Sequence, residues 1–582
     1  MRAATGLSEL NRALIAGSLL IVLPTCGEDH LQRLGDACAR DDECASGRCD
    51  EMVCKASFAA GIGEPCENAA ACRSGRCIVG LCVAGLRGGG ASCTDDQQCA
   101  SGRCSAGFCA ATGPDGGVPG DAATDAPATD APATDGGTHD GGAPGDALAR
   151  DGGFADQGVG GPAWCKQLGT ATSDRASAVT VDSSGNVYLM GLFGDGIDLG
   201  GGALATGGST TGRFAASYTA YGAHRWSRQV EGLSDAYGAA VGVDLSGNLY
   251  LAGSTTARID LVSLAAANGA DRWAQQMTGA SVIELFRLGV DPAGAVYITG
   301  DFWRTVDLGG GVLTSVNNGG DGFVAGYSRA TGEHLWSQRF GGPDPGPYES
   351  WEAVTGVALD ASGNLLLTGQ FSHEIDCGGG PLTTAGGNAD MFLGSLTAAG
   401  DHRWSLRYGA TGTEAGAYLV VGPSGNLFLA GQALGDGDFG GGILATSGVE
   451  RDIVLASYDA DGAHLWSKAL GWVGDDTVMG LGLDASENLY LAGEFQGVVD
   501  FGGGALTSAG GRDVYIASYT ASGDHRWSRR FGGLLNENVW DIAVDDAGAV
   551  IAAGDFQGTV DLGCGPVTSA GRDGYLVRIP PQ

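Results

Sequence analysis

Basic side chains are scarce in this chain of 582 residues. It has 32 lysines and arginines against 67 aspartates and glutamates, which gives a formal net charge of −35. Nucleic-acid binding needs clustered lysine and arginine to neutralise phosphates, so nucleic acid is excluded as a partner. Polycations and divalent metal ions are compatible with this negative charge as partners.

Long apolar runs are missing after the first 25 residues, and no later segment could span a bilayer as a helix. The run Ala13–Pro24 follows Arg2 and Arg12 and is itself too short to span, which predicts an export signal over residues 1–25. The run ends in LPTC, which resembles a bacterial lipobox with Thr25 where Gly, Ala or Ser is usual. The resemblance implies lipidation of Cys26, an anchor segment over 26–37 and display at the outer-membrane surface. Simple secretion is the alternative.

Histidine is absent from residues 38–109, where three modules (38–54, 66–82 and 93–109) share the spacing C-x5-C-x4-C-x4-C. Zinc sites usually pair ligands two to four residues apart and often include histidine, so the modules are interpreted as disulfide scaffolds of an exported chain. They resemble Dickkopf-type and EGF-like modules, and each leaves three pairings open. The disulfide-forming cysteines are Cys38, Cys44, Cys49, Cys54, Cys66, Cys72, Cys77, Cys82, Cys93, Cys99, Cys104 and Cys109.

Large apolar residues are nearly absent from residues 110–163, which consist mostly of Asp, Ala, Thr, Pro and Gly. Such a segment cannot bury enough apolar surface to offset its ordering entropy, and its like charges keep it extended. We expect a disordered acidic linker that separates the anchor from the rest of the chain.

Lysine is missing from glycine-rich segments that could pass for phosphate loops, such as DFGGGALTSAGG at Asp500–Gly511. A P-loop places Lys and then Ser or Thr after its last glycine, between a strand and a helix. Six segments of this kind recur, none has that lysine, and no helical pattern follows them. They are interpreted as tight reversals between strands.

Residues 164–582 are periodic. From Leu481 onward, LGLD, LYLAGEF, VYIASYT and HRWSRRF are four short strands joined by glycine- or asparagine-containing turns, which is typical of one antiparallel blade. The pattern predicts an all-β, seven-bladed propeller. A tryptophan recurs in similar company every 47 to 68 residues, at Trp164, Trp226, Trp273, Trp336, Trp404, Trp466 and Trp527.

The last unit has no fourth strand of its own, whereas AWCKQLG around Trp164 is a fourth strand without a blade. We therefore expect the N-terminal strand to complete the last blade, which removes two exposed sheet edges. A Cys165–Cys564 disulfide could latch this closure, leaving Cys377 free.

The units carry the pattern D-x-x-G-N-x-Y-x-x-G and resemble the SBBP-type bacterial propeller repeat over about 420 residues. Through GEHLW and GAHLW they more distantly resemble quinoprotein repeats. The resemblance implies the fold and leaves the activity open, because propellers host unrelated functions.

An acidic residue precedes each first strand. In the usual propeller layout these carboxylates would ring the mouth of the central channel. They either accept hydrogen bonds from the adjoining turn or bind a hard cation, calcium, while no other cofactor is required. The seven residues are Asp174, Asp235, Glu284, Glu352, Glu414, Asp476 and Glu537.

Histidine recurs two residues before the blade tryptophan, on strands too far apart to share a metal ion. These histidines are interpreted as turn and packing residues: His224, His334, His402, His464 and His525.

Aromatic residues that depart from the repeats are the candidate binding residues: Tyr348, Trp351, Trp472, Trp540 and Phe286. Exposed aromatics on one face could stack on sugars or anchor a protein partner, and packing between blades is the other explanation.

We predict a monomeric, non-enzymatic, surface-displayed protein that binds a glycan or a protein. The alternatives are a propeller enzyme, either a quinoprotein-like oxidoreductase or a glycosidase or lyase, and a purely structural envelope component. No Ser-His-Asp set stands apart from the repeats.

Overall fold

The computed structural model describes residues 163–582 except 170–172, 195, 208–209, 234–237, 317–318, 343–350, 387–388, 447–449 and 472–475. The chain divides into two compact units, Met1–Pro144 and Gly145–Gln582. In the first unit the described residues are six short strands: β1 (Cys49–Asp50), β2 (Val53–Cys54), β3 (Cys77–Ile78), β4 (Leu81–Cys82), β5 (Cys104–Ser105) and β6 (Phe108–Cys109).

These strands form one hairpin in each cysteine module, in which the third and fourth cysteines are register partners: Cys49 with Cys54, Cys77 with Cys82, and Cys104 with Cys109. The disulfide pairing of the modules, the export signal, Cys26, the anchor segment and nearly all of the linker lie outside the described residues.

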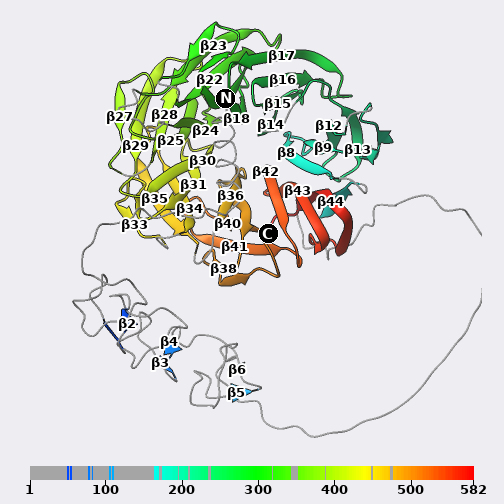
Figure 1. Ribbon diagram of the computed structural model, residues 1–582. Helices are drawn as coiled ribbons and strands as arrows, with labels where there is room; N and C mark the ends of the chain where they lie inside the picture. The colour runs from blue at the N-terminus through cyan, green and yellow to red at the C-terminus, as the bar shows by residue number, and fades with distance from the viewer. Residues whose placement is uncertain are drawn as a thin grey trace, which may run out of the picture. The chain divides into compact units, whose positions relative to one another are not determined.

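The second unit is a seven-bladed β-propeller in which each blade is a four-stranded antiparallel sheet (Figure 1). The first strands, nearest the axis, are β8 (Arg175–Val181), β14 (Gly238–Val243), β18 (Ile283–Val290), β24 (Glu352–Leu359), β30 (Thr413–Val421), β36 (Thr477–Leu483) and β42 (Glu537–Val544). The second strands are β9 (Val187–Phe193), β15 (Leu249–Thr255), β19 (Ala295–Trp303), β25 (Leu365–Phe371), β31 (Leu427–Leu434), β37 (Leu489–Phe495) and β43 (Val550–Asp561).

The third strands are β12 (Gly212–Tyr218), β16 (Arg258–Leu264), β22 (Gly320–Ser328), β28 (Asp390–Leu396), β34 (Arg451–Tyr458), β40 (Asp513–Tyr519) and β44 (Pro566–Ile579). The fourth strands are β13 (His224–Gln229), β17 (Asp271–Gly279), β23 (His334–Phe340), β29 (His402–Tyr408), β35 (His464–Leu470), β41 (His525–Phe531) and β7 (Trp164–Leu168). Within the described residues there is no helix, and hence none that could cross a membrane.

The turn between the first and second strands shows why the repeat motif folds as it does. In blade 1 the Asp182 carboxylate accepts hydrogen bonds from the backbone N–H groups of Ser184 and Asn186, each at 2.9 Å. It also accepts one from the Tyr188 hydroxyl at 3.0 Å. Gly185 has a φ of +74°, which L side chains rarely adopt. The motif D-x-x-G-N-x-Y therefore encodes both a tight reversal and the hydrogen bonds that hold it.

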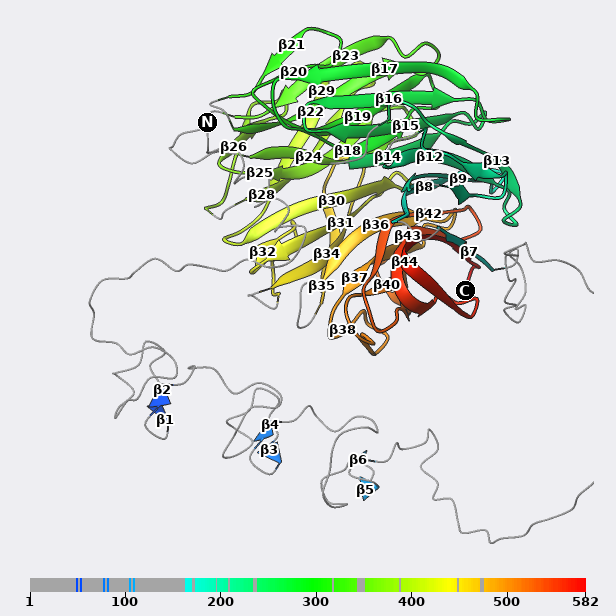
Figure 2. The ribbon, with the colours of Figure 1, turned by 45° about the vertical axis from the view of Figure 1, so that its right-hand side comes forward.

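The ring closes as expected from the sequence. Strand β7 pairs antiparallel with β44, where Cys165 is the register partner of Val577, so the start of the second unit completes the last blade (Figure 2). The first strands also contact one another in a closed cycle that includes β42 with β8. A disulfide joins Cys165 to Cys564, and Cys377 is a free, buried cysteine.

The glycine-rich segments are hairpins between second and third strands. The short strands are β10 (Ile197–Asp198), β11 (Ala203–Leu204), β20 (Thr305–Asp307), β21 (Val312–Thr314), β26 (Glu374–Asp376), β27 (Pro381–Thr383), β32 (Gly437–Asp438), β33 (Ile443–Leu444), β38 (Val498–Asp500) and β39 (Ala505–Thr507). Blade 2 has none, and the hairpin of blade 3 pairs through β20 with β17 instead, which makes a six-stranded sheet.

The recurring histidines pack on these hairpins. A Cβ atom at Gly201 would lie 2.6 Å from the His224 ring. The His224 Nε2 atom lies 3.0 Å from the Ser227 hydroxyl oxygen. The histidine is thus a packing partner of the glycine hairpin, and glycine is required because no side chain fits beneath the ring.

Tryptophan joins one blade to the next around most of the ring. The Trp273 indole N–H donates to the Arg329 carbonyl oxygen in the following blade at 3.1 Å. Gly332 of that same turn lies against the indole face, where a Cβ atom would be 2.6 Å from the ring. The same donation recurs from Trp164 to Ala220, Trp226 to Ala266, Trp336 to Ala398 and Trp466 to Ala521.

Substitution of Gly332 by alanine is expected to weaken the contact between the Trp273 indole and this turn. Gly332 has a φ of +75° and touches Trp273, whereas Gly232, with a φ of +77°, has no atom of the described residues within 4 Å of the point that a Cβ atom would occupy. Gly332→Ala should lower the free energy of unfolding by about 2 to 4 kcal/mol, and Gly232→Ala by about 1 kcal/mol. Equal losses in denaturant titrations would contradict a specific role of the indole contact.

Removal of the Cys165–Cys564 disulfide is expected to destabilise the propeller. Cys165→Ser should lower the free energy of unfolding by about 2 to 5 kcal/mol, because the bond closes a loop with a sequence separation of 399 residues. All 11 tryptophans lie at or after Trp164, so their fluorescence reports on the second unit alone. A reductant should shift the wild-type transition to that of the variant and leave the variant unchanged. A shift of both by the same amount would argue against a stabilising latch.

Candidate functional site

Five of the seven predicted strand-entry carboxylates are buried, Glu284 is half-buried, and Asp235 lies outside the described residues. Several accept hydrogen bonds from nearby backbone. Asp174 accepts one from the Gly194 N–H at 2.9 Å, and Glu537 accepts one from the Gly533 N–H at 2.8 Å. Glu537 binds the turn before its own strand, and Asp174 binds the residue after the second strand of its blade, so both interpretations drawn from the sequence stay predictions.

The strand-entry carboxylates also pair with aspartates of the preceding blade. The backbone N–H of Glu537 donates to the Arg512 carbonyl oxygen at 3.0 Å, which brings Glu537 beside Asp513. The same arrangement places Glu414 next to Asp390. Arginines of the fourth strands balance part of this charge: Arg530 lies 2.6 Å from Asp513, and Arg407 lies 2.6 Å from Asp390. Each junction of this type is thus two carboxyl groups and one guanidinium group.

Burial raises the pKa of both Glu414 and Glu537 to about 7. The adjacent aspartate adds to the rise, and the arginine and the backbone hydrogen bond oppose it. Glu414 Oε2 and Glu537 Oε1 have no hydrogen-bond partner among the described residues. A proton held by the glutamate would relieve the repulsion between the two carboxyl groups.

Metal binding by these carboxylates stays a prediction. Within residues 163–582, outside the undescribed gaps, no group of three or more His, Cys, Asp or Glu side chains is placed to hold a metal ion. At two blade junctions the carboxyl groups form pairs, Glu414 with Asp390 and Glu537 with Asp513.

Of the predicted aromatic residues that the structure describes, Trp540 and Trp351 bind aspartates of different blades. Trp540 is the bulge residue of β42, and its indole N–H donates to Asp555 at 2.5 Å. The Arg175 guanidinium of blade 1 lies 4.6 Å from the centre of the Trp540 ring. Trp351 instead donates to Asp301 at 2.6 Å, on the side of blades 3 and 4. Tyr348 and Trp472 lie outside the described residues.

Phe286 is the bulge residue of β18, next to a polar contact between first strands. The Arg287 guanidinium lies 4.0 Å from the centre of the Tyr418 ring in β30. Asp541 of β42 accepts a hydrogen bond from the Val179 N–H of β8 at 2.9 Å. Burial raises the pKa of Asp541 to about 6. These contacts join first strands of different blades, a packing role that the sequence did not reveal.

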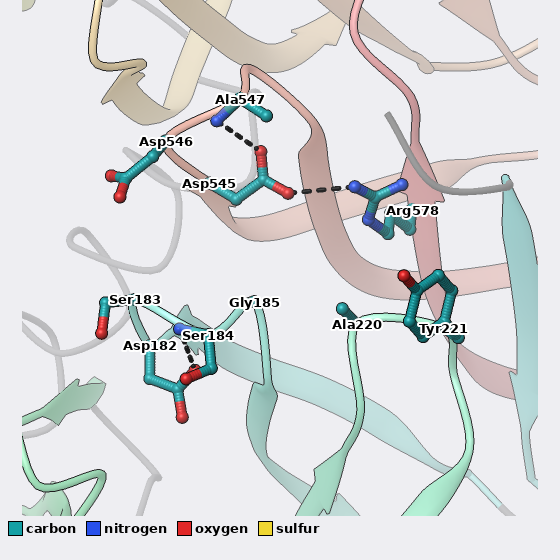
Figure 3. A pocket seen from close by; sticks show the side chains of 10 residues that line it. All are labelled: Asp182, Ser183, Ser184, Gly185, Ala220, Tyr221, Asp545, Asp546, Ala547 and Arg578. Carbon is teal, nitrogen blue, oxygen red and sulfur yellow. Dashed lines mark hydrogen bonds and ion pairs between the residues drawn. The ribbon is translucent and has the colours of Figure 1, made fainter. Parts of the chain in front are cut away.

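A cavity of about 220 Å³ lies at the seam between blades 7 and 1, and none of its lining residues was a candidate predicted from the sequence (Figure 3). Two turns that follow first strands form opposite walls, one with Asp182 and the other with Asp545 and Asp546. Arg578 of β44 and the exposed Tyr221 complete it, and Arg578 lies 3.0 Å from Asp545.

Two of these residues depart from the repeats. Tyr221 occupies a turn position that holds Asn268, Thr331, Ala399, Asp461 or Ser522 in other blades. Arg578 replaces a serine that in other blades binds an arginine of the fourth strand, as Ser217 binds Arg225 at 2.7 Å. The closing strand has Ala163 where those blades carry the arginine. A comparison of the repeats with one another would therefore have identified both residues.

The paired glutamates predict a pH dependence of stability. The pKa of each is raised in the folded protein, so the folded state holds more protons than the unfolded state between about pH 4.5 and 7, and stability falls as pH rises through this window. The free energy of unfolding of the wild-type protein should be higher at pH 5 than at pH 8, and Glu537→Gln should reduce that difference by up to about 3 kcal/mol. Urea titrations at both pH values measure this, with the exposed Glu231→Gln as the control. An unchanged difference in Glu537→Gln would contradict a proton held at this junction.

Comparison with known proteins agrees with the fold. The SBBP family model, described as a β-propeller repeat, matches residues 225–260. A curated relative, "Regulatory protein FlaEY" of Caulobacter vibrioides, is 24% identical over 214 residues. That alignment covers 35% of this chain and only 22% of the relative, so this chain spans a minor part of the relative's length.

Solved propellers are similar at low identity. A quinohemoprotein alcohol dehydrogenase from Comamonas testosteroni aligns at 13% identity and a TM-score of 0.34, covering 72% of this chain and 76% of that one. BamB from Moraxella catarrhalis aligns at 13% identity and a TM-score of 0.29, covering 71% and 94%. The chain therefore contains an SBBP β-propeller repeat, at residues 225–260, within a seven-bladed propeller.

Proposed function

We propose that this protein is a non-enzymatic binding protein whose propeller binds a glycan or a protein ligand. The proposal includes export and display at the cell surface, through a lipid on Cys26 or by secretion, with the linker as a spacer. It includes a monomeric state and no required cofactor, with calcium as the cation that a carboxylate site would take.

The observation that carries the proposal is the concentration of non-repeated side chains at the seam between blades 7 and 1. Arg175 stacks over Trp540 at the start of strands β8 and β42. Tyr221 and Arg578 line the cavity beyond the opposite ends of the same strands. A disulfide within blade 7 fixes the closing strand β7 to the hairpin between β43 and β44. Binding groups are best presented by a rigid scaffold, and the closed ring supplies one.

Repeated residues, by contrast, are engaged in the fold. The histidines pack on glycine hairpins, and the turn aspartates bind backbone amides. These histidine and aspartate side chains could otherwise act as a general acid, base or nucleophile, but they already make hydrogen bonds and packing contacts within each blade. This favours binding over catalysis.

One pair of carboxyl groups supports a second candidate, a glycosidase or lyase. Burial raises the pKa of Glu494 to about 7, and nearby Asp555 adds to the rise while Arg512 opposes it. Asp555 accepts hydrogen bonds from the Trp540 indole and from Asn538, and lies 3.1 Å from Arg572. Acid-catalysed glycoside cleavage uses two neighbouring carboxyl groups, one of which has a raised pKa and donates a proton. Glu494 is almost fully buried, so the binding proposal ranks first.

A broad glycan array probed with the full chain tests the proposal. Saturable binding is expected, and Trp540→Ala should weaken binding at the Trp540 end of the seam at least tenfold, whereas exposed Ile443→Ala, in a hairpin of blade 5, should not. Repetition in EDTA separates a calcium-dependent site from a metal-independent one. Absence of saturable binding would remove the glycan proposal, and release of cleaved sugar, lost in Glu494→Gln, would establish the enzyme instead.

A further inference from the structure

We infer that the seam cavity between blades 7 and 1 is a binding site for one uncharged sugar residue of a glycan. The inference rests on the proposed glycan-binding function and adds to it a second subsite, at the end of the seam opposite Trp540, and a ligand class. Three properties of the cavity support it: its preorganised turns, the polarity of its walls and its size.

The cavity is built from turns that the fold already holds in place. Asp182 binds two backbone amides of its own turn, and Asp545 binds those of Ala547 and Ala549 at 3.1 and 2.8 Å. The turn that carries Tyr221 is fixed by Trp164, whose indole N–H donates to the Ala220 carbonyl oxygen at 3.0 Å. Little conformational entropy is therefore lost when a ligand enters.

Arg578 is a buried charge aimed at this seam. It is 4% exposed, although it occupies a strand position that holds serine in most blades, and its guanidinium bonds to Asp545 at 3.0 Å. A buried arginine is tolerated only when it is paired. The pair places a hydrogen-bond donor and an acceptor side by side in one wall of the cavity (Figure 3).

The opposite wall and the rim supply the remaining contacts. Ser183 and the exposed Asp546 contribute a hydroxyl and a carboxylate. The Tyr221 side chain is 70% exposed, and its hydroxyl points toward the space between the two turns (Figure 3). Tyrosine combines an apolar ring with a polar end. A sugar ring has the matching surface, since its hydroxyl edges need donors and acceptors and its C–H face packs on an aromatic ring.

Size favours a single sugar ring over larger ligands. A volume of about 220 Å³ is below the range of about 300–1,000 Å³ typical of drug-sized ligands. Asp182 accepts four hydrogen bonds, and Asp545 accepts three, one of them from Arg578. With the exposed Asp546 the lining has three carboxylates and one arginine, so a basic side chain of a protein partner is the competing occupant that the test must separate from a sugar.

Saturation-transfer NMR of the full chain with glucose, galactose, mannose and N-acetylglucosamine tests the inference, with tri-lysine as the competing probe. At least one sugar should bind saturably. Tyr221→Ala should weaken it at least tenfold, and Tyr221→Phe less, because the ring remains. Leu245→Ala removes a residue that is 77% exposed, at the blade 2 position equivalent to Ser183, and should leave binding unchanged.

The possible outcomes separate this inference from the proposed function. Glycan-array binding that survives Tyr221→Ala but is lost in Trp540→Ala would overturn the cavity site and leave the binding function standing. Binding of tri-lysine without any sugar would overturn the ligand class in favour of a basic partner. Failure of wild-type protein to bind any glycan or free sugar would overturn the cavity site and the glycan part of the proposed function, and would leave a protein ligand.

Discussion

The propeller depends on the contact between a tryptophan on the fourth strand of one blade and a glycine turn in the next. The indole N–H of Trp273 bonds to a backbone carbonyl group in that turn, and the indole face requires glycine at position 332. Because the donation recurs around most of the ring, the outer edge of one sheet is coupled to its neighbour. At the seam the same contact, from Trp164 to the turn of Ala220, joins the beginning of the propeller to its first complete blade.

This arrangement constrains where function can lie. The repeated aspartates, histidines and glycines form the hydrogen bonds and close contacts of the turns and hairpins, so their side chains are needed for the fold itself. The side chains that depart from the repeats face fewer such demands. Several of them meet at the seam, where Arg175 lies over Trp540 at one end and Tyr221 lies beside Arg578 at the other. The disulfide between Cys165 and Cys564 lies within blade 7, where it fixes the closing strand β7 to the rest of that sheet.

Much of the fold could be predicted from the sequence, because each repeat contains the turn and strand residues of its own blade. Glycine and aspartate mark the turns, alternating apolar residues mark the strands, and the missing fourth strand points to closure by Trp164. The candidate site was harder to predict. Trp540 and Trp351 share the property of departing from the repeats, yet they bind Asp555 and Asp301 in different blades. Tyr221 and Arg578 are 357 positions apart and become neighbours only across the closed ring.

By itself, the sequence determined the number of blades, their order and the closing strand, because those features follow from turn chemistry and from hydrophobic patterns within about 60 residues. Only the tertiary structure decided which carboxyl groups share a junction, such as Glu537 and Asp513, and which turns enclose the cavity beneath Arg578. The physical reason is that burial and charge pairing between blades are set by the side chains of two sheets brought together. No local pattern in one sheet specifies which side chains the neighbouring sheet places against it.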